Sequence, residues 1–228
     1  MADIFDRTKL LIGESSLEKL KNCNILIVGV GGVGGYTLEI LTRCGIGNFT
    51  IVDGDNVDIT NINRQIIATH STIGKSKVEV FEMRMKDINP SVNVRALNVR
   101  FNEQTRDVIF DRHYDYVIDA IDSVQDKLLL ILTAKAKDYN IVSAMGAGNR
   151  VQLSDFQVID IFKTQNDKLA KKMRKLLKDN GVTKLDTVTS NTIPLQTNDN
   201  VIGSIAYMPS LAGVKLGGYV INQLLKES

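Results

Sequence analysis

The chain has 228 residues, of which 43% are hydrophobic, so it is long enough to bury a full core as one domain. Its 28 basic and 26 acidic residues give a net charge of +2, which by itself indicates no particular partner. Two cysteines exclude a four-cysteine zinc site, and the absence of a long apolar run or a secretory leader predicts a cytoplasmic protein that does not cross a membrane.

Strand-type and helix-type segments alternate along the chain, which is typical of a parallel sheet covered by helices. Strands are expected at 24–29, 48–53, 92–98, 115–120, 140–145 and 155–162. Helices are expected at 15–21, 32–44, 76–88, 104–111, 124–138, 167–179 and 210–226. We therefore expect an α/β fold, with a Rossmann-like, doubly wound, mainly parallel sheet and helices on both faces.

One domain is expected over 1–228, with a nucleotide-binding core at 22–150 and a C-terminal part at 151–228. The polar segment 181–200 is rich in turn residues and shows no clear period, so we expect a mobile loop there. Glycines between Gly213 and Gly218 fall within the last predicted helix, where glycine costs stability. They suggest the close approach of a neighbour, such as a second subunit.

A glycine-rich turn, Gly29-Val-Gly-Gly-Val-Gly34, directly follows the first predicted strand and opens a helix. Glycines at 29, 31 and 34 satisfy the dinucleotide fingerprint, in which backbone N–H groups approach phosphate at a helix N-terminus. Asp53 ends the second strand, where a carboxylate can accept the ribose hydroxyls. These features fit NAD and ATP equally well.

Polar residues that follow the second strand favour ATP, because a dinucleotide held by the glycine turn needs no such cluster. The residues that can donate to phosphate oxygens are Asn61, Arg64, Gln65 and Lys77. Asp119 and Asp122 end the strand at 115–120, and the carboxyl ends of parallel strands open onto the same crevice. A carboxylate there suits Mg²⁺, which takes one or two carboxylates together with substrate phosphates.

These motifs, with Asn61-Ile-Asn-Arg-Gln65 and Asp119-Ala-Ile-Asp122, resemble those of the ubiquitin-activating-like adenylating enzymes, the ThiF/MoeB/HesA superfamily. That resemblance covers roughly residues 5–150. Three further segments most resemble the family of tRNA threonylcarbamoyladenosine dehydratases and extend the resemblance to nearly the whole chain. They are Phe5-Asp-Arg-Thr-Lys-Leu-Leu-Ile-Gly13, Tyr116-Val-Ile-Asp-Ala-Ile-Asp-Ser123 and Gly203-Ser-Ile-Ala-Tyr-Met-Pro209.

The resemblance implies a role for each matched residue. The ATP site it implies consists of Gly29, Gly31, Gly32, Gly34, Asp53, Asp55, Asn61, Arg64, Gln65, Lys77 and Asp122. The catalytic set is Asp122, Arg64, Lys77 and Arg7, with Asp122 also holding the Mg²⁺ that accompanies ATP. Family members place an N-terminal arginine in the partner subunit's ATP site; Arg7 matches it, with Lys9 as the alternative. A homodimer, an alkali metal ion (Na⁺ or K⁺) and sulfur-relay partner proteins are further expectations from the family.

The implied reaction is the ATP-dependent cyclisation of threonylcarbamoyladenosine in tRNA, with its carboxylate activated by ATP and one water lost overall. No enzyme cysteine is needed, which agrees with the lack of any cysteine after Cys44. One alternative is an adenylyltransferase that activates the C-terminal glycine of a small sulfur-carrier protein. A nicotinamide-dependent oxidoreductase and an inactive nucleotide-binding scaffold are the more distant alternatives.

One basic segment, residues 163–178, carries seven basic side chains and a single acidic one. With helical spacing its leucines face one way and five lysines face the other: Lys168, Lys171, Lys172, Lys175 and Lys178. A solvated lysine-rich face is the ordinary interpretation of such a helix, and a nucleic-acid surface is the other. Given the family resemblance we expect these lysines to bind tRNA through its phosphates, and we expect no DNA partner.

Overall fold

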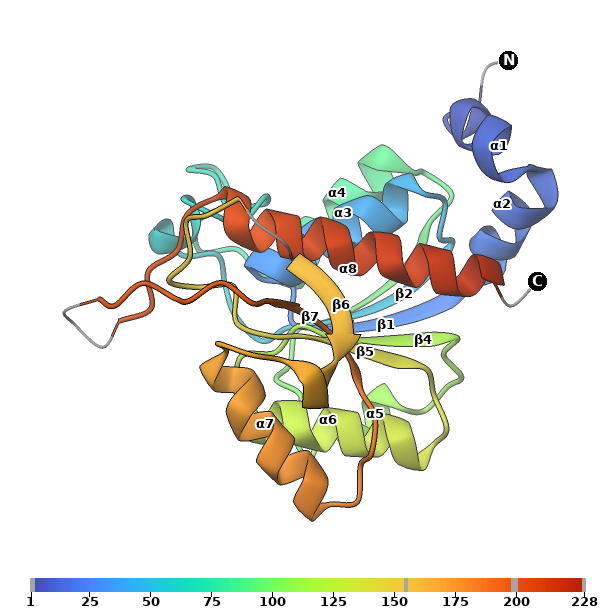
Figure 1. Cartoon of the computed structure of the whole chain (residues 1–228). Coiled ribbons are helices and arrows are strands. Elements are labelled where there is room, and N and C mark those ends of the chain that lie inside the picture. The colour runs from blue at the N-terminus through green and yellow to red at the C-terminus, as the bar shows by residue number, and fades with distance from the viewer. Residues whose placement is uncertain (1–2, 154–155, 198–200, 227–228) are drawn as a thin grey trace.

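A computed structural model of the chain describes residues 3–153, 156–197 and 201–226. The strands form one seven-stranded sheet in the order β3-β2-β1-β4-β5-β7-β6 (Figure 1). Their bounds are β1 Asn24–Val28, β2 Asn48–Val52, β3 Asn93–Leu97, β4 Tyr116–Asp119, β5 Ile141–Ala144, β6 Phe156–Asp160 and β7 Asp186–Ser190. Every neighbouring pair is parallel except β6 and β7, which are antiparallel. The predicted α/β, mainly parallel architecture is confirmed.

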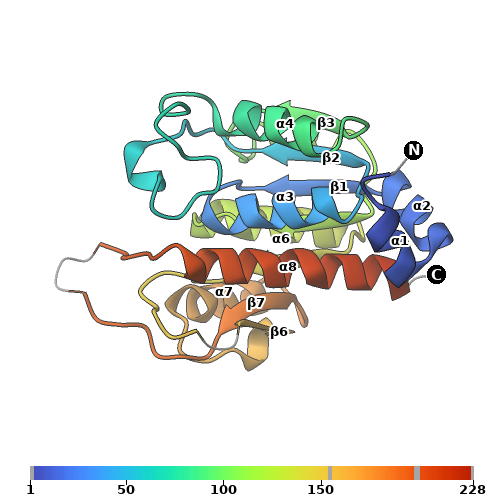
Figure 2. The ribbon, with the colours of Figure 1, turned by 90° about the horizontal axis from the view of Figure 1, so that it is seen from above.

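Helices cover both faces of this sheet. Their bounds are α1 Asp6–Ile12, α2 Glu14–Asn22, α3 Gly32–Arg43, α4 Lys77–Ile88, α5 Arg106–Ile109, α6 Val124–Ala136, α7 Lys168–Asp179 and α8 Tyr207–Lys226, with short 3₁₀ turns at Ile59–Asn61 and Ile161–Lys163. Helices α3, α4 and α8 lie on one face, and α5, α6 and α7 lie on the other (Figures 1 and 2). Within the described ranges, none of the helices has the length and hydropathy needed to span a bilayer.

The central strand β1 shows why its sequence is apolar without alternation. Ile25 and Ile27 belong to the core cluster beneath α3, α4 and α8, whereas Leu26 and Val28 belong to the cluster beneath α5, α6 and α7. All four side chains are buried. A parallel strand covered on both faces must bury successive residues in opposite directions, so a continuous apolar run is what it requires.

The six predicted strands and seven predicted helices are all present, with bounds that differ by a few residues. The prediction of a loop over 181–200 was wrong for β7, which lies inside that segment and pairs with β5 and β6. Its buried side chains include hydroxyls, such as Thr187, which donates to the Ile159 carbonyl. The predicted strand start at 155 and the loop residues 198–200 lie outside the described residues.

The close approach expected at the glycines of α8 is confirmed at Gly213 and Gly217, where the neighbour is a helix of the same chain and not a second subunit. A Cβ at Gly213 would lie 2.5 Å from the Val33 carbonyl oxygen, and one at Gly217 would lie 3.0 Å from Ile40 Cβ. Both neighbours are on α3, which packs along α8. Gly218 alone faces open space.

Candidate active site

The glycine turn between β1 and α3 is packed so closely that side chains cannot enter it. Gly29 has φ +89°, and a Cβ there would lie 2.6 Å from the Ala120 carbonyl oxygen. A Cβ at Gly34 would lie 1.9 Å from the Gly29 carbonyl oxygen. Gly31 is the N-cap of α3 and offers no side-chain cap, so the first amides of the helix from Gly32 onward are available to an anion.

Asp53, at the end of β2, is fixed opposite this turn by two backbone amides. Its Oδ2 accepts the Val30 N–H at 2.9 Å, and its Oδ1 accepts the Asp55 N–H at 2.9 Å. A carboxylate has about four lone-pair sites, so roughly two remain for further donors. The half-buried side chain is therefore held in place with acceptor capacity left over.

Lys77, the first residue of α4, is buried except for 6% of its surface, and its ammonium group is paired with Asp55. The Nζ to Oδ2 distance is 3.0 Å, and Arg100 approaches the other oxygen of Asp55 at 3.4 Å. Burial raises the pKa of Asp55, but the hydrogen bond from Lys77 and the charges of Lys77 and Arg100 outweigh it, so the net pKa is lowered. Arg100 was not predicted from the sequence, although its position shortly after β3 places it at the same edge of the sheet.

The segment after β2 orients the remaining polar side chains. Asn61 Oδ1 accepts the Asp58 N–H at 3.1 Å, which closes a capping box on the 3₁₀ turn. Arg64 donates from Nη1 to the Thr60 carbonyl at 2.8 Å and to Asn63 Oδ1 at 2.9 Å. The guanidinium is half-buried and keeps N–H groups that these two bonds do not use.

Gln65 lies beside the glycine turn with unused hydrogen-bonding capacity. The residue is 7% exposed, and its buried Oε1 has no hydrogen-bond partner. A Cβ built at Gly31 would lie 3.6 Å from its Nε2. A buried polar atom without a partner costs free energy, so this amide is suited to a ligand that enters the turn.

Asp119 and Asp122 differ sharply in their surroundings, although both lie at the carboxyl end of β4. Asp119 is fully buried, and its carboxylate accepts from Lys127 at 2.6 Å, from Ser143 and from the Ile121 N–H at 3.1 Å. Its carboxylate is thus occupied by protein donors, which leaves Asp122 as the aspartate of this strand end that is open to a metal. Asp122 is exposed in the loop between β4 and α6, without an ion pair or hydrogen bond in the described part of the chain.

The donor set agrees with Mg²⁺ brought by a nucleotide rather than with a metal held by protein alone. Among the described residues no group of three or more His, Cys, Asp or Glu side chains is placed to hold a metal ion. Asp122 supplies one free carboxylate, which is what Mg²⁺ takes from a protein when phosphates supply other ligands.

These residues converge because β1, β2 and β4 are adjacent and parallel, so their carboxyl ends share one edge of the sheet (Figure 2). Arg7 is the exception. It is exposed on α1, at the opposite edge, where α2 leads into the start of β1 (Figures 1 and 2). Lys9, the alternative, is bound to Glu14 at 2.9 Å, and that hydrogen bond raises the pKa of Lys9.

The basic helix is present as α7, and its lysine face is solvent-exposed. Asp167 caps it by accepting the Ala170 N–H at 2.9 Å, and the same carboxylate accepts the Gly146 N–H at 2.9 Å just after β5. The helix therefore begins at the carboxyl edge of the sheet. None of the five lysine side chains forms an ion pair or hydrogen bond within the described ranges; they belong to Lys168, Lys171, Lys172, Lys175 and Lys178.

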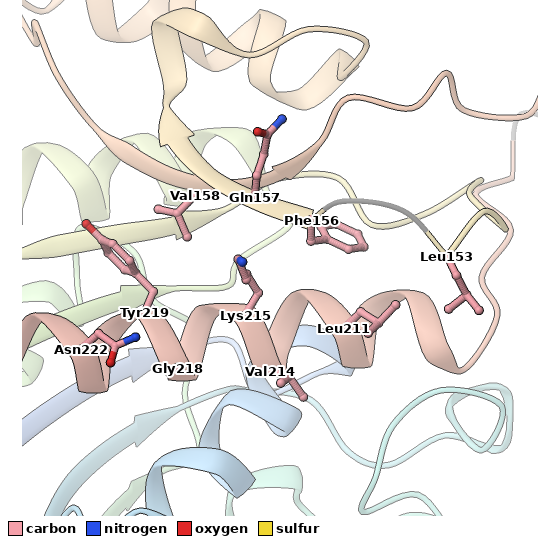
Figure 3. A pocket seen from close by; sticks show the side chains of 10 residues that line it. All are labelled: Leu153, Phe156, Gln157, Val158, Leu211, Val214, Lys215, Gly218, Tyr219 and Asn222. Carbon is pink, nitrogen blue, oxygen red and sulfur yellow. The ribbon is translucent and has the colours of Figure 1, made fainter. Parts of the chain in front are cut away.

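A groove of about 870 Å³ lies elsewhere, between α8 and the edge strand β6 (Figure 3). Its apolar lining includes Phe156 and Val158 from β6 and Leu211 and Val214 from α8. Gly218 forms part of the floor. The groove is separate from the glycine turn, and none of the candidate ATP-site residues lines it.

Comparison with known proteins gives consistent matches over the whole length. The ThiF family model matches residues 5–225. The chain is 39% identical over 241 residues to a tRNA threonylcarbamoyladenosine dehydratase of Bacillus subtilis, covering 98% of this chain and 95% of that protein.

Two solved structures of the Escherichia coli tRNA N6-threonylcarbamoyladenosine dehydratase have the same fold. Its complex with AMP has a TM-score of 0.92 and 32% identity, covering 100% of this chain and 98% of that one. Its complex with ATP has a TM-score of 0.92 and 33% identity, covering 98% of this chain and 94% of that one.

Proposed function

The chain belongs to the ThiF family, and we propose that it is an ATP-dependent tRNA threonylcarbamoyladenosine dehydratase. It converts the threonylcarbamoyl group on a tRNA adenosine to its cyclic form, with ATP as the second substrate. The observation that carries the proposal is the whole-length match to dehydratases, one of them solved with AMP and with ATP. The glycine turn, the fixed Asp53 and the exposed Asp122 provide the matching chemistry in this chain.

The geometry supports a specific division of roles. The amides at the start of α3, from Gly32 onward, and the Gln65 Nε2 group donate to the phosphates, while Asp53 accepts the ribose hydroxyls. Asn61, Arg64 and Lys77 supply donors for the phosphate oxygens. Before the nucleotide binds, the Lys77 ammonium group is paired with Asp55. The phosphates then compete with Asp55 for this ammonium group. Mg²⁺ would be held by Asp122 and would offset charge on the phosphates.

The reaction proceeds in two steps, activation of the carboxylate and ring closure. The substrate carboxylate attacks the α-phosphorus of ATP, an acyl–phosphate bond forms, and pyrophosphate leaves. A nucleophile within the same modification then attacks the acyl carbon, loses its proton and expels AMP, so the nucleoside loses one water overall. Arg64 and Lys77 stabilise charge that builds on the phosphates in the first step.

The decisive assay is incubation of the purified protein with ATP, Mg²⁺ and tRNA that carries threonylcarbamoyladenosine. The expected result is an ATP-dependent decrease in nucleoside mass equal to one water, measured after mild digestion that keeps the ring closed. No mass change in a protein that still binds ATP would contradict the proposal and favour the adenylyltransferase of a sulfur-carrier protein. Omitting K⁺ and Na⁺ from the same assay tests the proposed alkali ion.

We further propose a cytoplasmic homodimer, in contact with sulfur-relay proteins, whose ATP site is completed by Arg7 of the second copy. Two observations support the dimer part. Arg7 lies at the opposite edge of the sheet from the residues it should serve, so it cannot act within its own chain (Figure 2). The groove beside β6 and Gly218 also offers an apolar, unfilled face to a second copy (Figure 3).

Mixing two inactive variants tests both the dimer and the crossing arginine. Arg7→Ala and Asp122→Ala should each be inactive alone. After subunit exchange, half of the dimers are mixed, and each mixed dimer has one site with both residues intact, so about a quarter of wild-type activity should return. Activity is measured by the mass assay, and exchange is verified independently by co-purification of two differently tagged copies. No recovery despite proven exchange would show that Arg7 does not act across subunits.

A further inference from the structure

A fully buried ion pair lies beneath the loop that carries Asp122. Lys127 on α6 donates from Nζ to Asp119 Oδ2 at 2.6 Å, to Ser143 Oγ at 3.2 Å and to the Ala144 carbonyl at 3.0 Å. Ser143 Oγ donates to the same carboxylate oxygen. Both charged side chains have no solvent exposure. All three ammonium protons have acceptors, and the pair joins the ends of β4 and β5 to α6.

Stability alone does not explain a pair of charges at this depth. Removing two charges from water costs free energy that their attraction repays only in excellent geometry, and apolar side chains of similar volume often serve stability as well. The surrounding positions Val117, Leu130 and Ile131 are apolar and fully buried. Unlike an apolar contact, the charged pair is directional, and it links two fixed points of the chain.

Those two points flank Asp122. Only residues 120–123 join β4 to α6, so Asp119 stands just before the loop and Lys127 lies on the first turns of the helix after it. Within the loop, the Ile121 N–H donates to Asp119 Oδ1 at 3.1 Å. At its end, the Lys127 N–H donates to the Ser123 carbonyl at 2.9 Å. The ion pair therefore closes the base of the loop, while Asp122 itself has no bond that fixes it.

The same loop is in contact with the glycine turn between β1 and α3. The Ala120 N–H donates to the Val28 carbonyl at 2.9 Å, at the end of β1. The Ala120 carbonyl lies so close to Gly29 that a Cβ there would be 2.6 Å from it. A shift of the loop would therefore move Asp122 relative to the glycine turn, and with it relative to the phosphates.

We propose that Lys127 is a positioning residue: through Asp119 it sets the conformation of loop 120–123 and holds the Asp122 carboxylate at the edge of the crevice. The consequence for turnover rests on the proposed function, whereas the consequence for the loop does not. A misplacement of about 1 Å can cost about 10²-fold in rate. Loss of the pair should therefore lower kcat while leaving nucleotide and tRNA binding in place.

The test uses Asp119→Asn/Lys127→Met in the full-length protein, because this double variant removes the link without leaving a lone buried charge. We expect folded protein, wild-type affinity for ATP, an unchanged KM for tRNA and a kcat lower by about 10²-fold. Amides of residues 121–123 should exchange hydrogen faster. Ser143→Ala is the matched control, since it removes one bond to the same carboxylate and keeps the ion pair; its kcat should stay near wild type.

Asp119→Asn/Lys127→Leu is the second variant if the first does not fold, because it too leaves no lone buried charge, and it should show the same loss of kcat at unchanged ATP affinity. A folded variant with kcat near that of wild type would overturn the proposal. If wild type itself does not dehydrate the tRNA, the proposed function fails instead. Hydrogen exchange then decides the inference on its own, and unchanged protection of residues 121–123 would overturn it.

Discussion

Replacing Asp122 by alanine should lower kcat by at least about 10³-fold, because it removes the one free carboxylate at the proposed reaction centre. The fold should survive. Asp122 is exposed and has no ion pair or hydrogen bond in the described part of the chain, so its side chain contributes no contact that the native state would lose. The variant's melting temperature should therefore match that of wild type.

ATP binding separates a chemical defect from a binding defect in this variant. A ligand at about 100 times its Kd adds about 2.7 kcal/mol to the stability of the native state. For a chain of this size that corresponds to a rise in melting temperature of about 5–10 °C. Asp122→Ala should show most of this rise, whereas Arg64→Ala should show less and also lose turnover, since Arg64 is proposed to bind the phosphates directly.

Asp126→Ala is the matched control, because Asp126 is another acidic residue, in the first turn of α6, four positions further along. Its kcat should stay within about threefold of wild type, as expected for a charge outside the reaction centre. Full activity in Asp122→Ala would remove the assignment of the reaction centre to this loop.

The two aspartates of this loop show where sequence reasoning succeeds and where it stops. The strand pattern placed Asp119 and Asp122 at the carboxyl edge of the sheet, which the fold confirms. It could not separate their roles, because the burial of Asp119 depends on Lys127 from α6 and Ser143 from β5. Ser143 is distant in the sequence, and Lys127 is separated from Asp119 by a loop. No residue pattern indicates that either one contacts Asp119.

The missed elements have a similar physical cause. Helix α1 buries none of its residues, and Leu10 and Leu11 are 87% and 88% exposed, so its sequence has no apolar face that a periodicity can detect. Strand β7 buries the hydroxyl side chains of Thr187 and Thr189, which interrupt the apolar run that a search for buried strands detects. Their hydrogen bonds to neighbouring segments make burial possible, and only the fold shows them.

Glycines were predicted best where a close backbone contact requires them. At Gly34 the required space is local, since a Cβ would meet the Gly29 carbonyl oxygen, and Gly29 itself has φ +89°, so a short motif identifies both positions. At Gly213 and Gly217 the same requirement comes from α3, about 180 residues earlier in the chain, in a helix packing that favours small residues. The sequence showed the need for a neighbour there but not which helix supplies it.

Reversing three charges on α7, with Lys171→Glu, Lys172→Glu and Lys175→Glu, should weaken tRNA binding by about 10²-fold or more at moderate salt. All three lysines are exposed and unpaired in the described structure, whereas the apolar side of the helix, including Met173 and Leu177, is buried. The substitutions therefore change the surface charge without touching the packing. Against Lys168, Arg174 and Lys178 the new glutamates replace like charges with opposite ones, while the pairs 171/175 and 172/175 stay alike in sign, so helix stability should change little.

Salt dependence distinguishes phosphate contacts from a general loss of fold. Each lysine that contacts a phosphate adds about 0.7–0.9 to the slope of log Kd against log salt. If all three make contacts, the slope should decrease by about 2–3, and the difference in affinity should be largest at low salt. The measurement is a titration of labelled tRNA at several salt concentrations.

The control variant Lys135→Glu/Lys137→Glu/Lys226→Glu changes net charge by the same amount. All three of its lysines are exposed and lie at the ends of α6 and α8 away from the crevice edge (Figure 1). Long-range attraction to tRNA depends on net charge, so both variants should lose that part alike. Only the α7 variant should also show a smaller slope of log Kd against log salt. The reason is that α7 begins at the crevice edge, where Asp167 accepts the Gly146 N–H just beyond β5. Equal slopes for the two variants would show that α7 does not contact the tRNA backbone.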